Sequence, residues 1–338
     1  MSFFLYVSCA GDRQIYVLAM EPKTGALRTV TKVAVPGMGE PGTSMPLALN
    51  PDRTVLYAAV RTPPFPCASF AVDTKEGGLT LLGVAPLADQ MAYIVTDRTG
   101  RHLLGASYFG SKISCNPIDG RGIVRGPATQ VIETPPKAHS ILTDPTNRFV
   151  FAASLGGDCI FRTAFDAASG MMQVLPPVPV HAGAGPRHLR FSPDGRFLYL
   201  INELDGTIIA YSFDAASGTL TELQTTTVLP PGADAKAASA DIHLTPNGRF
   251  LYGSERVTNT LAAFRVDAAS GKLSPIGSVS SEPSPRGFAI DPSGAFLLCA
   301  GQTSNRVAVY SIDQENGALT RTGVYDVGAN PNWIEFLR

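Results

Sequence analysis

The sequence carries little charge and has no cluster of one sign. Of its 338 residues, 27 are Lys or Arg and 28 are Asp or Glu, so the net charge is −1 and no basic run occurs. Nucleic acids and anionic membranes are recognised through clustered positive charge. We therefore expect neither of them as a partner.

Long apolar segments and paired cysteines are also missing. No stretch approaches the roughly 18 apolar residues of a membrane-spanning helix. The opening residues, MSFFLYVSCAGDR, lack the charged start and long apolar run of a secretory signal. The five cysteines are far apart and form no CxxC, which favours reduced, mostly buried thiols over a disulfide framework or a zinc site. These absences predict a cytoplasmic protein.

Signals for helices and for nucleotide cofactors are absent as well. No long segment shows the 3.6-residue periodicity of an amphipathic helix. No GxGxxG sequence opens a helix, so no cofactor is expected. The 27 Pro and 33 Gly are spread along the chain, which indicates many turns.

What the chain does contain is an internal repeat. A polar turn followed by an apolar strand recurs roughly every 50 residues. The copies are NPDRTVLYAAV, TDRTGRHLLGAS, TDPTNRFVFAAS, SPDGRFLYLIN, TPNGRFLYGSE and DPSGAFLLCAG, and the N-terminal FFLYVSC supplies a seventh. Between them lie β-hairpins with Gly turns, such as IIAYSFDAASGTLTEL. Short alternating runs bounded by Gly, Asp and Ser predict strands.

About four strands in each repeat predict an all-β, seven-bladed β-propeller formed by residues 1–338 as a single domain. A two-sheet sandwich does not explain seven copies. The first repeat lacks its innermost strand, and the C-terminal PNWIEFLR resembles that strand. We expect it to join the N-terminal blade and close the ring, leaving no open edge there. The DAASG turns are expected to be exposed outer hairpins.

Two positions of the repeat are polar although the strands around them are apolar. The innermost strand of a blade lines the central channel and the second runs antiparallel to it, so the start of one and the end of the other share a rim. The first position carries Met45, Ala92, His139, Arg187, Ala240 and Arg286. The second carries Arg61, Tyr108, Leu155, Glu203, Arg256 and Gln302. We expect the polar members to surround one mouth of the channel, as a binding site.

The candidate catalytic residues are His139, Arg187, Glu203 and Arg286. A plain ion pair between Arg187 and Glu203 would not require three cationic groups at equivalent places. The candidate substrate-binding residues are Arg61, Tyr93, Tyr108, His188, Asp241, Arg256 and Gln302.

Three polar residues that follow the starts of inner strands can be interpreted in two ways. His188, Asp241 and His243 either contact a ligand or form hydrogen bonds within the channel and the core. Asp241 and His243 also resemble a pair of metal ligands, but two ligands without partners are weak evidence, and no metal is predicted.

The sequence is similar to the seven-bladed lactonase family, best known from bacterial 6-phosphogluconolactonases, with fungal carboxy-muconate lactonizing enzymes as a more distant branch. The resemblance is carried by GAGPRHLRFSPD, by NEL sixteen residues after the Arg, and by ASADIHLTPNGR, PRGFAIDPSG, AGQTSNRVAVY and GANPNW. It implies a site built from the His of HS, the Arg of GPRH, the Glu of NEL and the Arg of PRGF. These are the four residues that the repeat selects.

The chain departs from the family pattern near the expected mouth. Tyr93, in AYIV, replaces a His that bacterial members tend to carry in the motif THIS. Lys236, in AKAAS, stands where an Arg-Trp pair is usual, and the loop RTPPFPCAS after Arg61 is this chain's own. These departures bear on whether the substrate is phosphorylated more than on the lactone chemistry.

The resemblance implies hydrolysis of a sugar lactone, with or without a phosphate group. Glu203 or His139 would take a proton from the attacking water, and the other would protonate the leaving oxygen. Arg187 and Arg286 would stabilise the developing oxyanion or bind an anionic group of the substrate. Two alternatives stay open: a lactone isomerase or cycloisomerase using the same residues, and a non-enzymatic binding scaffold. The absence of the WD dipeptide is evidence against the scaffold.

Overall fold

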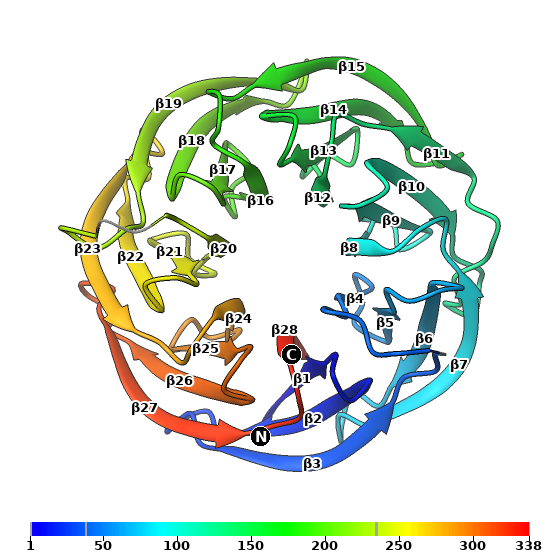
Figure 1. The fold of residues 1–338 in the computed structure, drawn as a ribbon, viewed down its shortest axis with the longest axis horizontal. Coiled ribbons are helices and arrows are strands. Elements are labelled where there is room, and N and C mark those ends of the chain that lie inside the picture. Colours follow the sequence, from blue (N-terminus) through cyan, green and yellow to red (C-terminus); the bar gives the residue numbers. More distant parts are fainter. Residues whose placement is uncertain (1, 38, 234–235, 338) are drawn as a thin grey trace.

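The computed structural model describes residues 2–37, 39–233 and 236–337. All 28 regular elements in these ranges are β-strands, and they form seven four-stranded sheets. The sheets stand around a central axis as the blades of a propeller (Figure 1). The seven-bladed β-propeller predicted from the repeat is confirmed. No helix in the described ranges is long and apolar enough to cross a membrane.

Each sheet runs outward from the axis in chain order, apart from the first. The first four sheets are β28 (Pro331–Leu337), β1 (Phe3–Cys9), β2 (Gln14–Met20) and β3 (Leu27–Ala34); β4 (Leu47–Leu49), β5 (Val55–Ala59), β6 (Pro66–Val72) and β7 (Leu79–Pro86); β8 (Met91–Thr96), β9 (His102–Ser107), β10 (Lys112–Pro117) and β11 (Gln130–Glu133); β12 (Ala138–Thr143), β13 (Phe149–Ser154), β14 (Cys159–Asp166) and β15 (Met171–Pro179). The other three are β16 (Pro186–Phe191), β17 (Phe197–Asn202), β18 (Thr207–Asp214) and β19 (Thr219–Thr227); β20 (Ser239–Leu244), β21 (Phe250–Glu255), β22 (Thr260–Val266) and β23 (Leu273–Ser280); β24 (Pro285–Ile290), β25 (Phe296–Gly301), β26 (Arg306–Ile312) and β27 (Leu319–Asp326).

The ring is closed by the last strand of the chain, as the sequence predicts. Strand β28 pairs antiparallel with β1, with Tyr6 opposite Glu335. Asn332 reinforces the closure, because its Oδ1 accepts hydrogen bonds from Ser8 Oγ at 3.3 Å and from the Met45 backbone N–H at 3.0 Å. The last strand is therefore tied both to the first strand and to the next blade.

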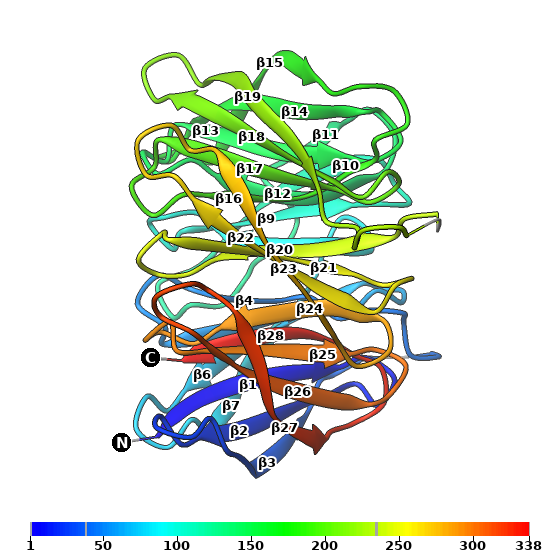
Figure 2. The ribbon, with the colours of Figure 1, turned by 90° about the vertical axis from the view of Figure 1, so that its left-hand side faces the viewer.

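The hydrophobic core lies between neighbouring blades, and this leaves the axis to polar side chains. Second strands such as β17 and β21 are buried along their whole length. They are packed on both faces by adjacent sheets. The outermost strand β3 is largely exposed. In Figure 2 the inner strands β20 and β24 run along the axis, whereas the outer β23 and β27 cross it steeply, as the twist of a sheet requires.

A β-bulge interrupts six of the seven innermost strands near their start, at a place that the repeat does not reveal. The pairing register shifts by an extra residue between Ala138 and Ser140, between Pro186 and His188, and between Pro285 and Gly287. Equivalent shifts occur in β8, β20 and β28. The extra residues are Ala92, His139, Arg187, Ala240 with Asp241, Arg286 and Asn332. A bulge leaves its extra residue unpaired and redirects the side chain, here toward the channel.

Two further expectations, on the cysteines and on the outer turns, are also confirmed. All five cysteines are free and buried. The DAASG turns carry exposed aspartates at positions 166, 214 and 267. The turns also connect blades, because Tyr199 on β17 donates its hydroxyl to the carbonyl of Gly271 at 2.9 Å.

Candidate active site

The bulge residues converge on one small pocket at the end of the channel where the innermost strands begin. The pocket is lined by Ser44, Ala92, His139, Arg187, His188, Asp241, Arg286, Gly287, Asn332 and Trp333. Three of the four predicted catalytic residues, His139, Arg187 and Arg286, thus share a pocket. Its enclosed volume is about 10 Å³, close to the space that one water molecule needs.

Glu203, the fourth predicted residue, does not line this pocket but holds two of the surrounding arginines. It follows the end of β17, and its Oε2 accepts a hydrogen bond from Arg187 Nε at 2.8 Å. Its Oε1 lies 3.1 Å from a terminal nitrogen of Arg256. Burial alone would raise the pKa of Glu203, but the charges of Arg187 and Arg256 outweigh it and lower that pKa. Glu203 is therefore an ionised carboxylate shared by two guanidinium groups.

Positive charge exceeds negative charge at this end of the channel. Arg187 and Arg286 line the pocket, and the charges of Arg61 and Arg256 also act on Arg286. Glu203 is the carboxylate that contacts Arg187 and Arg256. Within the described ranges the Arg286 side chain makes no hydrogen bond or ion pair, although it is only partly exposed. Burial, followed by the charges of Arg187 and Arg256, lowers the pKa of Arg286 to about 9. Such an arrangement is stabilised by an anion.

His139 is buried against other rings and is neutral in this environment. Its ring centroid is 5.6 Å from that of Tyr108 and 5.2 Å from that of His188. Burial, followed by the charge of Arg187, holds the pKa of His139 well below 6.5. Its Nδ1 has no hydrogen-bond partner among the described residues. A neutral imidazole facing a cationic pocket can accept a proton.

The predicted residues at the ends of the second strands lie on the same rim. Arg61 donates to Ser44 Oγ at 2.8 Å, and Arg256 Nε donates to the carbonyl of Ala238 at 2.8 Å. Tyr108 packs on His139. Gln302 donates to Asn330 Oδ1 at 2.7 Å, so its amide is engaged in the wall.

Tyr93 lies deeper in the channel than the sequence interpretation expects. It does not line the small pocket, where its neighbour Ala92 takes the bulge position. Its hydroxyl instead accepts a hydrogen bond from Arg190 at 2.6 Å, and its ring packs against those of Trp333 and His188. The bulge in β8 shifts the pairing by one residue, and this shift decides which end of the channel the Tyr93 side chain faces.

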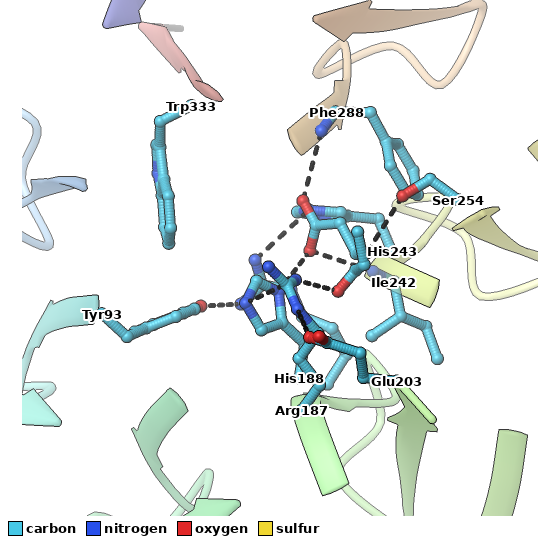
Figure 3. A network of polar contacts seen from close by, with 12 residues as sticks. Tyr93, Arg187, His188, Glu203, Ile242, His243, Ser254, Phe288 and Trp333 are labelled. Carbon is cyan, nitrogen blue, oxygen red and sulfur yellow. Dashed lines mark hydrogen bonds and ion pairs between the residues drawn. The ribbon is translucent and has the colours of Figure 1, made fainter. Parts of the chain in front are cut away.

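His188 and His243 belong to a buried polar network in the channel (Figure 3), and Asp241 contacts both of them. His188 Nδ1 lies 2.8 Å from Asp241 Oδ1, and His243 Nε2 lies 3.2 Å from Oδ2. The backbone N–H groups of Ile242 and Phe288 also donate to this carboxylate. Burial alone would raise the pKa of Asp241, but His243 and His188 hold it well below 3.8. No group of three or more His, Cys, Asp or Glu placed to hold a metal occurs in the described part of the chain.

Sequence reasoning missed Ser44, Asn332 and Trp333 as parts of the pocket. Asn332 occupies in β28 the bulge position that Arg187 and Arg286 occupy in their strands. Continuing the repeat register into the GANPNW segment would have found it.

A larger cavity, of about 380 Å³, opens at the opposite end of the channel. Size alone favours that end as the active site, but its lining contains neither His139 nor Arg187 nor Arg286. We assign the candidate active site to the small pocket, because charge and proton-accepting groups converge there.

Comparisons with known proteins agree with this fold. A sequence model described as "Lactonase, 7-bladed beta-propeller" matches residues 4–336. The 6-phosphogluconolactonase of Pectobacterium carotovorum is 40% identical over 339 residues, covering 100% of this chain and 99% of the relative. That of Serratia proteamaculans is 37% identical, with coverage of 100% and 99%. The solved structure of a periplasmic gluconolactonase from Pseudomonas aeruginosa matches with a TM-score of 0.91 and 28% sequence identity, and 99% of each chain is covered. The chain belongs to the seven-bladed β-propeller lactonase family.

Proposed function

We propose that the protein hydrolyses a sugar lactone that carries an anionic group, with 6-phosphogluconolactone as the first candidate. Two full-length relatives bear the name of that activity. The observation that carries the proposal is the position of Arg286, which lines the pocket with Arg187 and His139 but has no hydrogen bond or ion pair to the residues described. A phosphate or carboxylate of the substrate supplies the missing partner.

The anionic group has a second effect, on His139. In the free protein the surrounding arginines help to keep the pKa of this histidine low, which makes it a weak base. A bound anion offsets their charge and moves the pKa of His139 upward, toward the range where a general base is most effective. Substrate binding thus prepares the base that the reaction uses.

The reaction begins when water attacks the lactone carbonyl carbon and gives a proton to His139. The carbonyl oxygen becomes an oxyanion, and the guanidinium of Arg187 or Arg286 stabilises it. Collapse of this intermediate breaks the ring C–O bond, and the leaving oxygen takes the proton back from His139. The product is the open-chain acid. No external cofactor enters the balance.

Glu203 acts in this scheme as a positioning residue for Arg187 and Arg256. Its two oxygens lie 2.8 Å and 3.1 Å from these guanidinium groups, and its lowered pKa makes it a poor proton acceptor. The sequence left open whether Glu203 or His139 is the base, and we propose that it is His139.

Ring isomerisation and scaffolding are the competing functions. The names of the full-length relatives support hydrolysis, with water as the nucleophile, over ring isomerisation. Converging buried charges in a concave pocket suit a small molecule better than a protein partner. Cytoplasmic location stays a prediction, since the Pseudomonas relative is described as periplasmic.

The proposal is tested by following acid release at constant pH with 6-phosphogluconolactone, gluconolactone and a pentonolactone. We expect the highest kcat/KM with the phosphorylated lactone and a free acid as product. Formation of a new lactone without acid release would identify an isomerase. No turnover of any of the three would refute the proposal.

A further inference from the structure

The larger cavity of the channel lies at the end opposite the candidate active site. It is built from the later residues of the innermost strands, including Tyr93 on β8, Arg190 on β16, His243 on β20, Phe288 on β24 and Glu335 on β28. Its volume of about 380 Å³ falls at the lower end of the range for small-molecule sites. The cavity is thus large enough for a compact metabolite.

Arg190 contributes a positive charge to the wall of this cavity. Its guanidinium is partly buried, donates to the Tyr93 hydroxyl at 2.6 Å and lies 3.3 Å from His243 Nε2. No carboxylate lies within 4.0 Å of it among the described residues. Because a guanidinium carries five N–H donors, these two contacts leave several of them for a ligand.

Asp241 does not neutralise Arg190 by contact, although it lines the same cavity. One of its oxygens already accepts from His188 Nδ1 and from the Ile242 N–H, and the other accepts from the Phe288 N–H. A carboxylate that already accepts three hydrogen bonds has little capacity left. The charge of Arg190 therefore lacks a directly bonded counter-ion.

The rest of the lining indicates which anion fits. Glu335 is fixed by a hydrogen bond from Trp333 Nε1 at 2.9 Å and lines the cavity. Glu335 and Asp241 balance the charges of Arg190 and Arg53 in the cavity wall, which favours a singly charged ligand over phosphate. Glu335 can also accept hydrogen bonds from hydroxyl groups of the ligand. The rings of Trp333 and Phe288 supply apolar surface. The planar guanidinium of an arginine can donate two parallel hydrogen bonds to the two oxygens of a carboxylate.

We propose that this cavity is a second binding site, for a small hydroxylated monocarboxylate held by Arg190 and Glu335. Tyr93, which departs from the pattern of the resembling family, orients Arg190 through its hydroxyl. The site is separate from the small pocket, and the proposal does not depend on the lactonase reaction. The two cavities share Asp241 and Trp333 in their walls.

Trp333 provides the measurement, because it is the chain's single tryptophan and lines both cavities. Its fluorescence is titrated with D-gluconate and, separately, with inorganic phosphate. The titrations use the unmodified protein, the variant Arg286→Gln to weaken the active-site pocket, and the variant Arg190→Gln to remove the proposed anchor. Arg196→Gln is the control, since this arginine pairs with Asp194 at the surface.

We expect Arg286→Gln and Arg196→Gln to retain a saturable gluconate signal. Adding Arg190→Gln to Arg286→Gln should weaken it about tenfold or more, the effect of losing a charge-assisted hydrogen bond. Phosphate should bind the Arg286→Gln protein more weakly than gluconate does. A crystal structure of that variant grown with gluconate should place the carboxylate beside Arg190.

Three outcomes overturn the proposal. The first is an Arg286→Gln protein that shows no saturable gluconate signal. The second is a signal that Arg190→Gln leaves unchanged. The third is phosphate binding at least as tight as gluconate, which would refute the ligand class. If Arg190→Gln fails to fold, Arg190→Lys keeps the charge but loses the fork, and an unchanged gluconate affinity in that variant would overturn the assignment of the fork.

Discussion

His188 and Asp241 lie 2.8 Å apart, Nδ1 to carboxylate, while the other ring nitrogen of His188 faces the guanidinium of Arg187 at 3.2 Å. A guanidinium only donates hydrogen bonds, so Nε2 of His188 must accept and Nδ1 must carry the proton. Asp241 therefore selects the tautomer of His188 that can hold Arg187. Asp241 belongs to the wall of the candidate active site, and it acts on Arg187 through the intervening His188 ring.

Replacing Asp241 by Asn tests this relationship. The amide has no charge to hold a proton on Nδ1 of His188, so we expect a mixture of tautomers and a loosened Arg187. The kcat/KM for an anionic lactone should fall about tenfold, and the ¹⁵N chemical shifts of the His188 ring should move. Asp205→Asn, which alters the surface contact of Asp205 with His181 at 2.6 Å, is the matched control. Unchanged ring shifts would rule out the positioning role.

Arg286→Gln should change substrate preference more than it changes turnover. The variant removes a cation that has no partner in the described residues. Loss of a charge-assisted hydrogen bond costs about 1.5–3 kcal/mol, or roughly tenfold to a hundredfold in affinity. We expect this loss in kcat/KM for 6-phosphogluconolactone but a small one for gluconolactone. Equal losses would instead assign Arg286 to the oxyanion.

His139→Gln should reduce kcat by about 10²–10⁴-fold, the usual contribution of a general base, with a smaller change in KM. The base must be unprotonated, so activity is lost as the pH falls through its pKa. Because that pKa is well below 6.5 in the free protein, the acid limb of kcat/KM should lie below pH 6.5.

The acid limb of the pH profile of kcat should lie at a higher pH than that of kcat/KM, since kcat reports the substrate-bound state. This displacement should be smaller with uncharged gluconolactone. Coincident limbs for both substrates would contradict the proposal that the anion raises the pKa of His139.

Stability should fall in mild acid because of His188. Burial, followed by the charge of Arg187, lowers the pKa of His188 to about 3 in the folded protein, against about 6.5 in an unfolded chain. Between these values the unfolded state binds the extra proton, so the free energy of unfolding decreases as the pH is lowered, by up to about 1.4 kcal/mol per pH unit.

Thermal unfolding of the variant His188→Gln should therefore depend less on pH between about 6.5 and 3 than that of the parent protein. His181→Gln, at the surface, is the control. A pH dependence unchanged by His188→Gln would show that another group is responsible.

Gly287→Ala should destabilise the ring at its closure. A Cβ on Gly287 would lie 2.4 Å from the backbone oxygen of Asn332, so β24 and β28 would have to move apart. We expect a loss of a few kcal/mol, as for other overpacked sites, measured by denaturant unfolding. Gly78→Ala, where the nearest atom would be 3.8 Å away, should be close to neutral. Equal stabilities for the two variants would contradict the close approach of these strands.

The sequence repeat was sufficient for the fold because each blade obeys the same local rule. A turn such as SPDG followed by FLYLIN predicts one buried strand, and seven copies of that rule determine the ring. The closure by residues 331–337 was predictable for the same reason, since the first repeat lacks one strand.

The site was predictable only in part, because a bulge is not visible in an alternating pattern. The register places Arg187 and Arg286 at one position, and the structure brings them to one pocket. The extra residue in β8 places Ala92 at that pocket and sends Tyr93 to Arg190. Pairing between blades, as between Glu203 and Arg256, depends on distances that no single repeat contains.

The last strand contributes Asn332 and Trp333 to the wall of the pocket. A ribosome that has yet to release residues 331–337 therefore holds a polypeptide whose ring is open and whose pocket lacks one side. We therefore expect ring and pocket to be completed in the same step, when the final strand joins β1, and a chain that ends before residue 331 to lack both.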